Sequence, residues 1–266
     1  LLDLFIRYGK IHLFLMGGIL MKTRMVIISI FIIFILTGCS STAGLNDDLI
    51  NAAFSGDVEK VKNLVERGAD VNAVDINSER RRSVLTIASI KGHKEIVDFL
   101  LHKGANVNQT NNLGATALHG AAQANQVQVA EILIAKGAQV NAQAKNGITP
   151  LLTASTPGHQ EVIKLLIDKG ADVKVKTIQG WTALHIVSQK GYTVIAGLLV
   201  AGGADLNAQT SSGITPLMTA ARFGKIEIVK FLLQKGAKKE LKSRDGQTAL
   251  DIAKQYNHLE LLQLLK

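Results

Sequence analysis

The sequence contains a single cysteine, Cys39, among its 266 residues. A disulfide bond within one chain needs two cysteines and is therefore excluded. Small extracellular folds often rely on such bonds, because an oxidising compartment allows them to persist. This fold has to be stabilised by packing alone.

Motifs that carry catalysis are also missing. The chain has no nucleophile elbow, no phosphate-binding loop and no zinc-protease motif. It has seven histidines, but none forms a closely spaced pair of the usual metal-ligand kind. Acidic residues are single and scattered. We therefore expect neither an enzyme nor a protein that holds a cofactor or a metal.

One pattern is repeated instead, from about Asp47 to the end of the chain. It is marked by Gly-Ala pairs, which begin 36 residues apart and then recur every 33 residues. A fixed period in this range indicates a solenoid, in which each unit stacks on its neighbours because it is too small to bury a core of its own. The pairs begin at Gly68, Gly104, Gly137, Gly170, Gly203 and Gly236.

Each unit predicts two helices joined by a tight turn. A threonine such as Thr182 stands 21 residues before the Gly-Ala pair, where its hydroxyl oxygen can cap the first helix. Pro150 and Pro216 occupy the first helical position, which needs no backbone N–H. Nine residues after the threonine only Gly or Asn occurs, and these residues adopt positive φ most readily. A second helix follows, with an apolar stripe such as that of Ile96 to Leu101.

The segment between units predicts a hairpin-like loop, called a finger below. A short extended arm follows each Gly-Ala pair, and a glycine two residues before the next threonine turns the chain. The turn glycines are Gly114, Gly147, Gly180, Gly213 and Gly246. The second unit differs, because it has three extra residues before Ser83 and Arg81 in place of the glycine. We therefore expect a remodelled finger over residues 77–82.

These motifs together resemble the ankyrin repeat. The family's helix start is matched at residues 114–122, its centre at 92–101 and its end at 68–73. The resemblance covers residues 47–266 and implies an all-α ankyrin-repeat solenoid of about seven helix-turn-helix repeats joined by hairpin-like fingers. It also implies a concave groove that binds partner proteins. The first unit lacks a finger and the last ends at Lys266 within its second helix, so we expect both to act as caps.

The resemblance also gives the histidines structural roles. His119 and His185 stand at the position where the family uses the ring to brace the repeat by local hydrogen bonds. His93, His159 and His258 follow the turn between the two helices, which is another family position. We expect these five rings to support the fold.

The segment before the repeats resembles a bacterial lipoprotein signal peptide. Lys22 and Arg24 precede an apolar segment of eleven residues, 26–36, which is shorter than the roughly 20 residues of a membrane-spanning helix. Residues 36–39, Leu-Thr-Gly-Cys, then match a lipobox. The resemblance implies a signal peptide over residues 21–38 and a lipidated Cys39, which begins a short linker over residues 39–46. An uncleaved signal sequence or anchor is the alternative.

Residues 1–20 do not fit this signal peptide, because Met21 begins a complete signal by itself. We expect them to be a non-translated or leader extension, and a true long leader is the alternative. Ser40 favours the outer membrane facing the periplasm in a Gram-negative cell. In a Gram-positive cell the protein would lie on the outer face of the plasma membrane.

The formal net charge is +9, and the chain without residues 1–38 keeps +6. The densest basic run is Arg80-Arg81-Arg82, which could contact phosphate or lipid headgroups or could be a solvated loop tip. Nucleic acid is not expected as a partner of a membrane-tethered chain.

The resemblance also assigns partner-binding positions at the finger tips and at the exposed ends of the first helices. Ile148, Trp181 and Ile214 share one position in three successive repeats and should form an apolar row, although such residues also shield finger bases. The remodelled finger is the second candidate surface. The full set is Asn112, Leu113, Gln123, Lys145, Ile148, Ile178, Trp181, Gln189, Lys190, Ile214, Arg222, Phe223, Arg244, Gln247, Gln255 and Tyr256.

We therefore expect a monomeric, membrane-anchored, extracytoplasmic ankyrin-repeat scaffold that binds a partner protein without catalysis. Support of an envelope enzyme is one specific role. The alternatives are an immunity or inhibitor lipoprotein that neutralises a toxin, and a surface protein that contacts host proteins.

Overall fold

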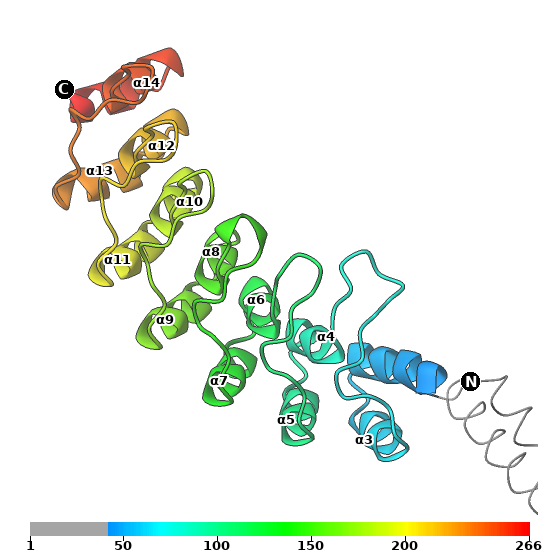
Figure 1. Ribbon diagram of the computed structural model, residues 1–266. Helices are drawn as coiled ribbons and strands as arrows, with labels where there is room; N and C mark the ends of the chain where they lie inside the picture. Colours follow the sequence, from blue (N-terminus) through cyan, green and yellow to red (C-terminus); the bar gives the residue numbers. More distant parts are fainter. Residues whose placement is uncertain (1–41) are drawn as a thin grey trace, which may run out of the picture.

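The computed structural model describes residues 42–266, which contain fourteen α-helices in seven pairs and no strand. Figure 1 shows the pairs following one another along a curved array with the two ends of the repeat domain far apart. The first helix of each pair and the fingers lie on the inner side of the curve, and the second helices lie on the outer side. The all-α ankyrin-type fold expected from the sequence is confirmed.

The helix boundaries follow the repeat. The first helices span residues 42–55, α4 (Val84–Lys91), α6 (Ala117–Gln123), α8 (Pro150–Ser155), α10 (Ala183–Lys190), α12 (Pro216–Arg222) and α14 (Ala249–Gln255). The second helices are α3 (Val58–Glu66), α5 (Lys94–His102), α7 (Val127–Ala135), α9 (Gln160–Asp168), α11 (Thr193–Ala201), α13 (Ile226–Gln234) and α15 (Leu259–Leu265). One 3₁₀ turn, η1 (Lys145–Gly147), lies in the third finger.

The predicted caps and turns are present. The side chains of Thr149, Thr182 and Thr215 accept hydrogen bonds from the backbone N–H three residues later, at 3.3, 3.4 and 3.2 Å. Proline follows two of these threonines at the start of α8 and α12. The residue that ends each first helix has positive φ throughout the array, from 55° at Asn125 to 85° at Gly191. Each helix pair is therefore defined by local backbone chemistry.

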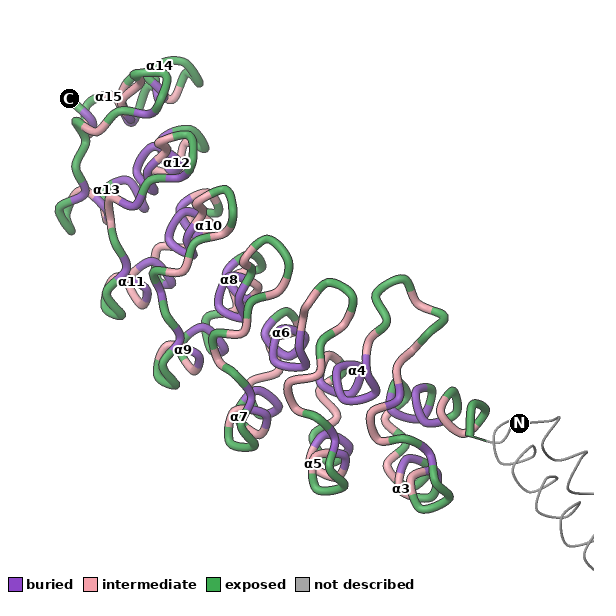
Figure 2. Tube along the Cα trace, viewed as in Figure 1, coloured by how far each residue is buried: buried purple, intermediate pink, exposed green. Residues whose placement is uncertain are grey.

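The core is continuous along the array, as the purple segments in Figure 2 show. The first helices within the array pack between the first helices of the neighbouring repeats, so residues of α6 such as Leu118 and Ala121 are fully buried. A second helix buries only one stripe, which in α5 is Ile96, Val97 and Leu100. Burial of a leucine side chain contributes about 1.5–3 kcal/mol, and in such arrays it is realised at the interface with the next repeat.

Asparagine side chains also tie consecutive repeats together. Asn72, Asn108, Asn141 and Asn207 each accept a hydrogen bond from a backbone N–H at the start of the next arm, at 2.7–2.9 Å. In the fifth unit this position is Lys174, which has no acceptor oxygen. No hydrogen bond to the corresponding donor, the N–H of Asp205, is present among the described residues. The asparagine ladder therefore lacks one rung.

The expected linker lies partly in the repeat domain. Residues 42–46 are helical and continue the first helix, and Asn46 accepts a hydrogen bond from the N–H of Asp70 at 2.8 Å. Asn46 is thus a member of the asparagine ladder. The expected leader, the signal peptide and Cys39 lie outside the described residues. Within residues 42–266, no helix has the length and apolar character needed to cross a membrane.

Candidate functional site

The fingers after the first form a continuous edge through backbone hydrogen bonds. Within each one, the arm closes by a bond between residues four apart, such as Thr177 N–H to Trp181 O at 2.9 Å. From the third finger on, each finger also donates to the one before it, as Ser211 N–H does to Gln179 O at 2.9 Å. The turn glycine permits this approach, because a Cβ on Gly180 (φ 81°) would lie 2.8 Å from Ser211 N. Backbone hydrogen bonds therefore hold these fingers together along the edge of the inner face.

The first finger departs from this arrangement, as the sequence predicted. Asp75 N–H donates to Arg82 O, so three more residues are enclosed than in the other fingers. The Asp75 carboxylate accepts the N–H groups of Asn77 and Ser78 at 3.1 Å, and Arg81 adopts the positive φ of 46° that glycine supplies elsewhere. No backbone hydrogen bond joins this finger to the second within the described chain. The contact is made by Asn112 Nδ2, which donates to Glu79 O.

Two histidines connect the first helices to the following fingers. His185 Nε2 lies 3.0 Å from Ile214 O, and its Nδ1 accepts from Thr182 N–H at 3.2 Å. His119 makes the matching contacts with Ile148 O and Thr116 N–H. Burial lowers the pKa of the His119 ring and lowers the pKa of His185 to about 4. Both rings are therefore neutral braces with Nε2 as the donor.

The inner face is hollowed at the N-terminal half of the array. A hollow of about 660 Å³ is lined by the first helices α4, α6 and α8 and by the first three fingers, together with Thr177 of the fourth finger and Ile186 of α10. Its floor contains Gly120, where the other complete repeats have Ile or Thr. Ile90 Cγ1 lies 2.8 Å from where a Gly120 Cβ would be. The glycine therefore lets the Ile90 side chain pack closely against α6, and a side chain at position 120 would displace Ile90.

Four predicted contact residues are brought together in the hollow: Leu113, Gln123, Lys145 and Ile148. They are joined there by Arg80 and Arg82 of the first finger, the second candidate surface of the sequence analysis. The predicted apolar row is only partly open. Ile148 is 37% exposed, whereas Trp181 and Ile214 are half-buried. The Trp181 ring lies tilted against His185, with ring centroids 5.7 Å apart.

Apart from Asn112 in the second finger, the other predicted residues lie along the C-terminal half of the same face. The Arg222 guanidinium lies 5.2 Å from the centre of the Tyr256 ring and 5.9 Å from that of Phe223, and both rings are 41% exposed. Gln247 Nε2 donates to Gln255 Oε1 at 2.8 Å. Asn112, Ile178, Lys190 and Arg244 are exposed, and Gln189 is half-buried.

Several residues of the hollow were missed by sequence reasoning. Thr86, Thr153, Thr156 and Pro157 line it together with Ile90. Their positions vary between repeats, so the period alone does not mark them. Gly120 was the one signal of the hollow in the sequence, because it places a glycine on the inner face of a predicted helix.

The remaining histidines brace the turns between helices. His93, His159 and His258 each place Nε2 at 2.9–3.3 Å from a backbone carbonyl of the preceding repeat. Across the described part of the chain, no group of three or more His, Cys, Asp or Glu side chains could hold a metal ion. The geometry of the inner face is that of a contact surface.

Comparisons with known proteins agree with this geometry. The family described as "Ankyrin repeats (3 copies)" matches residues 49–144, 140–210 and 184–266. The human protein named "Ankyrin repeat and KH domain-containing protein 1" is 41% identical over 68 residues, which are 26% of this chain and 3% of that protein. The mouse "B-cell lymphoma 3 protein homolog" is 45% identical over 71 residues, 27% of this chain and 15% of that protein.

The rice "Probable E3 ubiquitin-protein ligase XBOS33" is 39% identical over 90 residues, which are 34% of this chain and 17% of that protein. In each case the match spans less than a fifth of the relative's length. The similarity to these relatives is therefore limited to the repeats, and their other activities are not assigned to this chain.

Proposed function

The chain belongs to the ankyrin-repeat family, and we propose that it is a non-catalytic scaffold whose inner face binds a partner protein while a lipid on Cys39 holds it in a bacterial envelope. Ankyrin repeats generally bind protein partners. The partner of this chain, the anchor and the location are the parts that we propose.

The observation that carries the proposal is the distribution of exposed apolar side chains. Contiguous exposed apolar surface usually marks an interaction site, and aromatic residues are enriched in interface cores. Of nine large hydrophobic residues that are exposed in the described chain, only Val194 and Leu259 lie on second helices. The other seven lie on fingers or at the ends of first helices: Phe54, Ile76, Leu113, Ile148, Ile178, Phe223 and Tyr256.

The membrane anchor rests on the sequence motif alone. The positive residues, the short apolar core and the Leu-Thr-Gly-Cys segment stand in the order of a lipoprotein signal. A lipidated chain that begins at Cys39 would have only residues 40 and 41 between the lipid and the described helix. The repeat array would then lie close to the bilayer surface.

The first experiment is affinity purification from membranes in mild detergent, with mass spectrometry of what is bound. A Cys39→Ser form is the matched control, because it removes the acylation site and leaves residues 42–266 unchanged. We expect lipid incorporation and membrane fractionation in the natural form only, and one stoichiometric protein with both forms. The identity of the bound protein would distinguish the roles: a toxin would indicate immunity, an envelope enzyme would indicate enzyme support, and a host protein would indicate host contact. Recovery of no protein by either form would contradict the scaffold.

A pair of substitutions tests whether the inner face is the contact. Ile178 is 75% exposed at a finger tip, and Val194 is 64% exposed on the outer helix α11. We expect Ile178→Asp to weaken partner capture at least fivefold and Val194→Asp to leave it unchanged, because only the first charge enters the groove. Equal capture by both variants would place the contact elsewhere. The Trp181 ring also packs on His185, so partner capture by Trp181→Ala should be compared with the melting temperature of that variant.

A further inference from the structure

From the lining of the hollow, we infer that the N-terminal half of the groove takes an acidic protein segment with a bulky apolar side chain, which packs on the apolar lining that includes Ile90, Leu152 and Ile186. This inference rests on the proposed function and names the chemistry of the partner. The binding site is the hollow lined by α4, α6, α8 and the first three fingers.

The charge of the hollow favours an acidic ligand. Arg80, Arg82 and Lys145 line the hollow, and no aspartate or glutamate does. Along the first helices α4 to α14 the only acidic residue is Asp251, whose carboxylate accepts from Thr248 N–H and Oγ1. Glu79 precedes Arg80 but does not line the hollow and forms no ion pair within the described chain. An acidic ligand would meet no like charge here.

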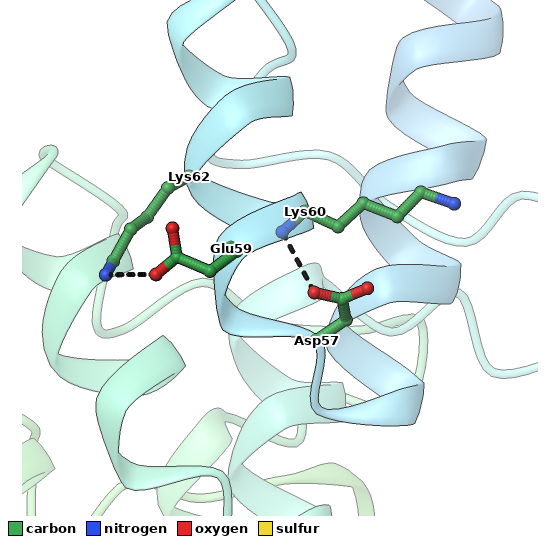
Figure 3. A network of polar contacts seen from close by, with 4 residues as sticks. All are labelled: Asp57, Glu59, Lys60 and Lys62. Atoms are coloured by element: carbon green, nitrogen blue, oxygen red, sulfur yellow. Dashed lines mark hydrogen bonds and ion pairs between the residues drawn. The ribbon is translucent and has the colours of Figure 1, made fainter.

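These three cations have no ion-pair partner within the described residues. All four ion pairs of the described residues lie within second helices: Glu59–Lys62, Asp98–His102, Lys164–Asp168 and Glu227–Lys230. Figure 3 shows the first of them, on α3, beside the cap in which Asp57 accepts from the Lys60 backbone N–H. The side chains of Arg80, Arg82 and Lys145 form no ion pair and no hydrogen bond within residues 42–266. Complementary charge sets partner choice and association rate.

The apolar part of the lining favours an acidic protein segment over a simple polyanion. The floor of the hollow is mostly apolar, with Ile90, Leu113, Ile148, Leu152 and Ile186 among the residues that line it. A nucleic acid or a row of phosphates would neutralise the arginines but leave this floor uncovered. A leucine or an aromatic side chain would cover it, and burial of such a side chain contributes about 1.5–3 kcal/mol. Arginine also provides fork-shaped donors that match a carboxylate.

The shape of this hollow depends on two features that the other repeats do not have. The position of Gly120 is Ile87, Thr153, Ile186, Thr219 or Ile252 in the other complete repeats. The wall on the other side is the remodelled first finger, which carries both arginines. Two departures from the repeat therefore meet at one place, and the hollow combines them.

The test uses a random 16-residue peptide library displayed on phage and selected on the full chain. We expect the enriched peptides to be net negative and to contain a bulky apolar residue. One enriched peptide is then labelled with fluorescein, and its affinity is measured by anisotropy. We expect Arg80→Glu/Arg82→Glu to weaken binding at least tenfold. Lys60→Glu/Lys169→Glu reverses two exposed charges on the outer side and should change affinity less than twofold.

A third variant tests the floor without changing charge. Gly120→Thr copies the residue of the next repeat, and its Cβ would displace Ile90, which lies 2.8 Å away in the lining of the hollow. The variant should weaken a peptide with an aromatic anchor at least fivefold, with an unchanged circular dichroism spectrum. A version of the peptide with serine in place of the apolar anchor should bind the natural chain with an affinity that is lower by the same factor. This peptide should bind the natural chain and the Gly120→Thr variant equally.

Several outcomes would overturn the inference. These are an enriched set without acidic bias, equal loss in both charge-reversal variants, and binding of inorganic polyphosphate as strong as that of the peptide. Absence of any enriched peptide would overturn it as well. Peptides that respond to Arg222→Glu but not to the Arg80 pair would place binding in the C-terminal half. That last result would leave the proposed scaffold intact, whereas failure of the membrane capture experiment would overturn the scaffold itself.

Discussion

His185 makes the stability of the array depend on pH in a direction that can be worked out. The ring is fully buried, and both nitrogens are engaged, Nε2 with Ile214 O and Nδ1 with Thr182 N–H. Burial, and secondarily the charge of Lys176, lowers its pKa to about 4, although the bonded carbonyls act in the opposite direction. In the unfolded chain the same ring has a pKa near 6.5. Protonation of Nδ1 would also place a donor against the Thr182 N–H.

The magnitude follows from proton linkage. Above pH 6.5 neither state binds a proton at this ring, and its effect on stability is constant. As the pH falls from 6.5 to 4, the unfolded chain binds a proton that the folded chain does not, so stability is lost by about 1.4 kcal/mol per pH unit. From pH 7.5 to pH 5.0 the loss is about 2 kcal/mol for His185. The pKa of His119 is lowered too, so its contribution has the same sign.

The assay is urea unfolding followed by circular dichroism at pH 7.5 and pH 5.0. His185→Leu places at this position the residue that the preceding repeat has, Leu152, and removes the titrating ring. We expect the pH-dependent loss of unfolding free energy to be about 2 kcal/mol smaller in His185→Leu than in the natural chain. Met218→Leu, at the equivalent position of the next repeat, should keep the natural dependence. Equal pH dependence in all three proteins would refute the reasoning.

Two further predictions use matched positions of the repeat. Gly180→Ala should lower the free energy of unfolding by about 1–3 kcal/mol, because φ is 81° and the new Cβ would lie 2.8 Å from Ser211 N. Gly246→Ala, with φ 76° and no atom within 4 Å, should cost less; an equal cost in urea titrations would show that the contact between fingers is unimportant. Lys174→Asn should restore the missing rung of the asparagine ladder and raise the unfolding free energy by about 0.5–1.5 kcal/mol. Lys174→Ala is its control, and an equal gain in the control would rule out the hydrogen bond as the cause.

The fold was predictable because each of its features depends on local chemistry that recurs. Gly92, Asn125 and Gly158 share one left-handed turn, and Thr149 and Thr215 share one cap, so every copy confirms the others. The remodelled first finger was predictable for the same reason, as a departure from an established pattern. The described part of the expected linker was not, since nothing around Asn46 resembles the regular end of a repeat.

The candidate site was harder to predict because it depends on the residues that do not recur. The hollow combines Arg82, Gly120 and Pro157 from three successive repeats, and their combined shape appears only when the repeats are stacked. The orientation of Trp181 is a similar case. Its position in the repeat marks it as a contact, whereas its ring lies partly against His185. Periodicity therefore locates the face, and the individual side chains decide where it is open.

The first finger has a further consequence for motion. The second to sixth fingers share backbone hydrogen bonds, so one of them can move only by breaking a bond to its neighbour. The first finger is joined to the second by a side-chain bond from Asn112. We expect its opening to cost less than that of the third to fifth fingers, which have backbone bonds to both neighbours, and its amides to exchange with solvent sooner. The hollow thus has one wall held by backbone hydrogen bonds and one wall held by a side-chain hydrogen bond, and only the second can shift without loss of a backbone bond between fingers.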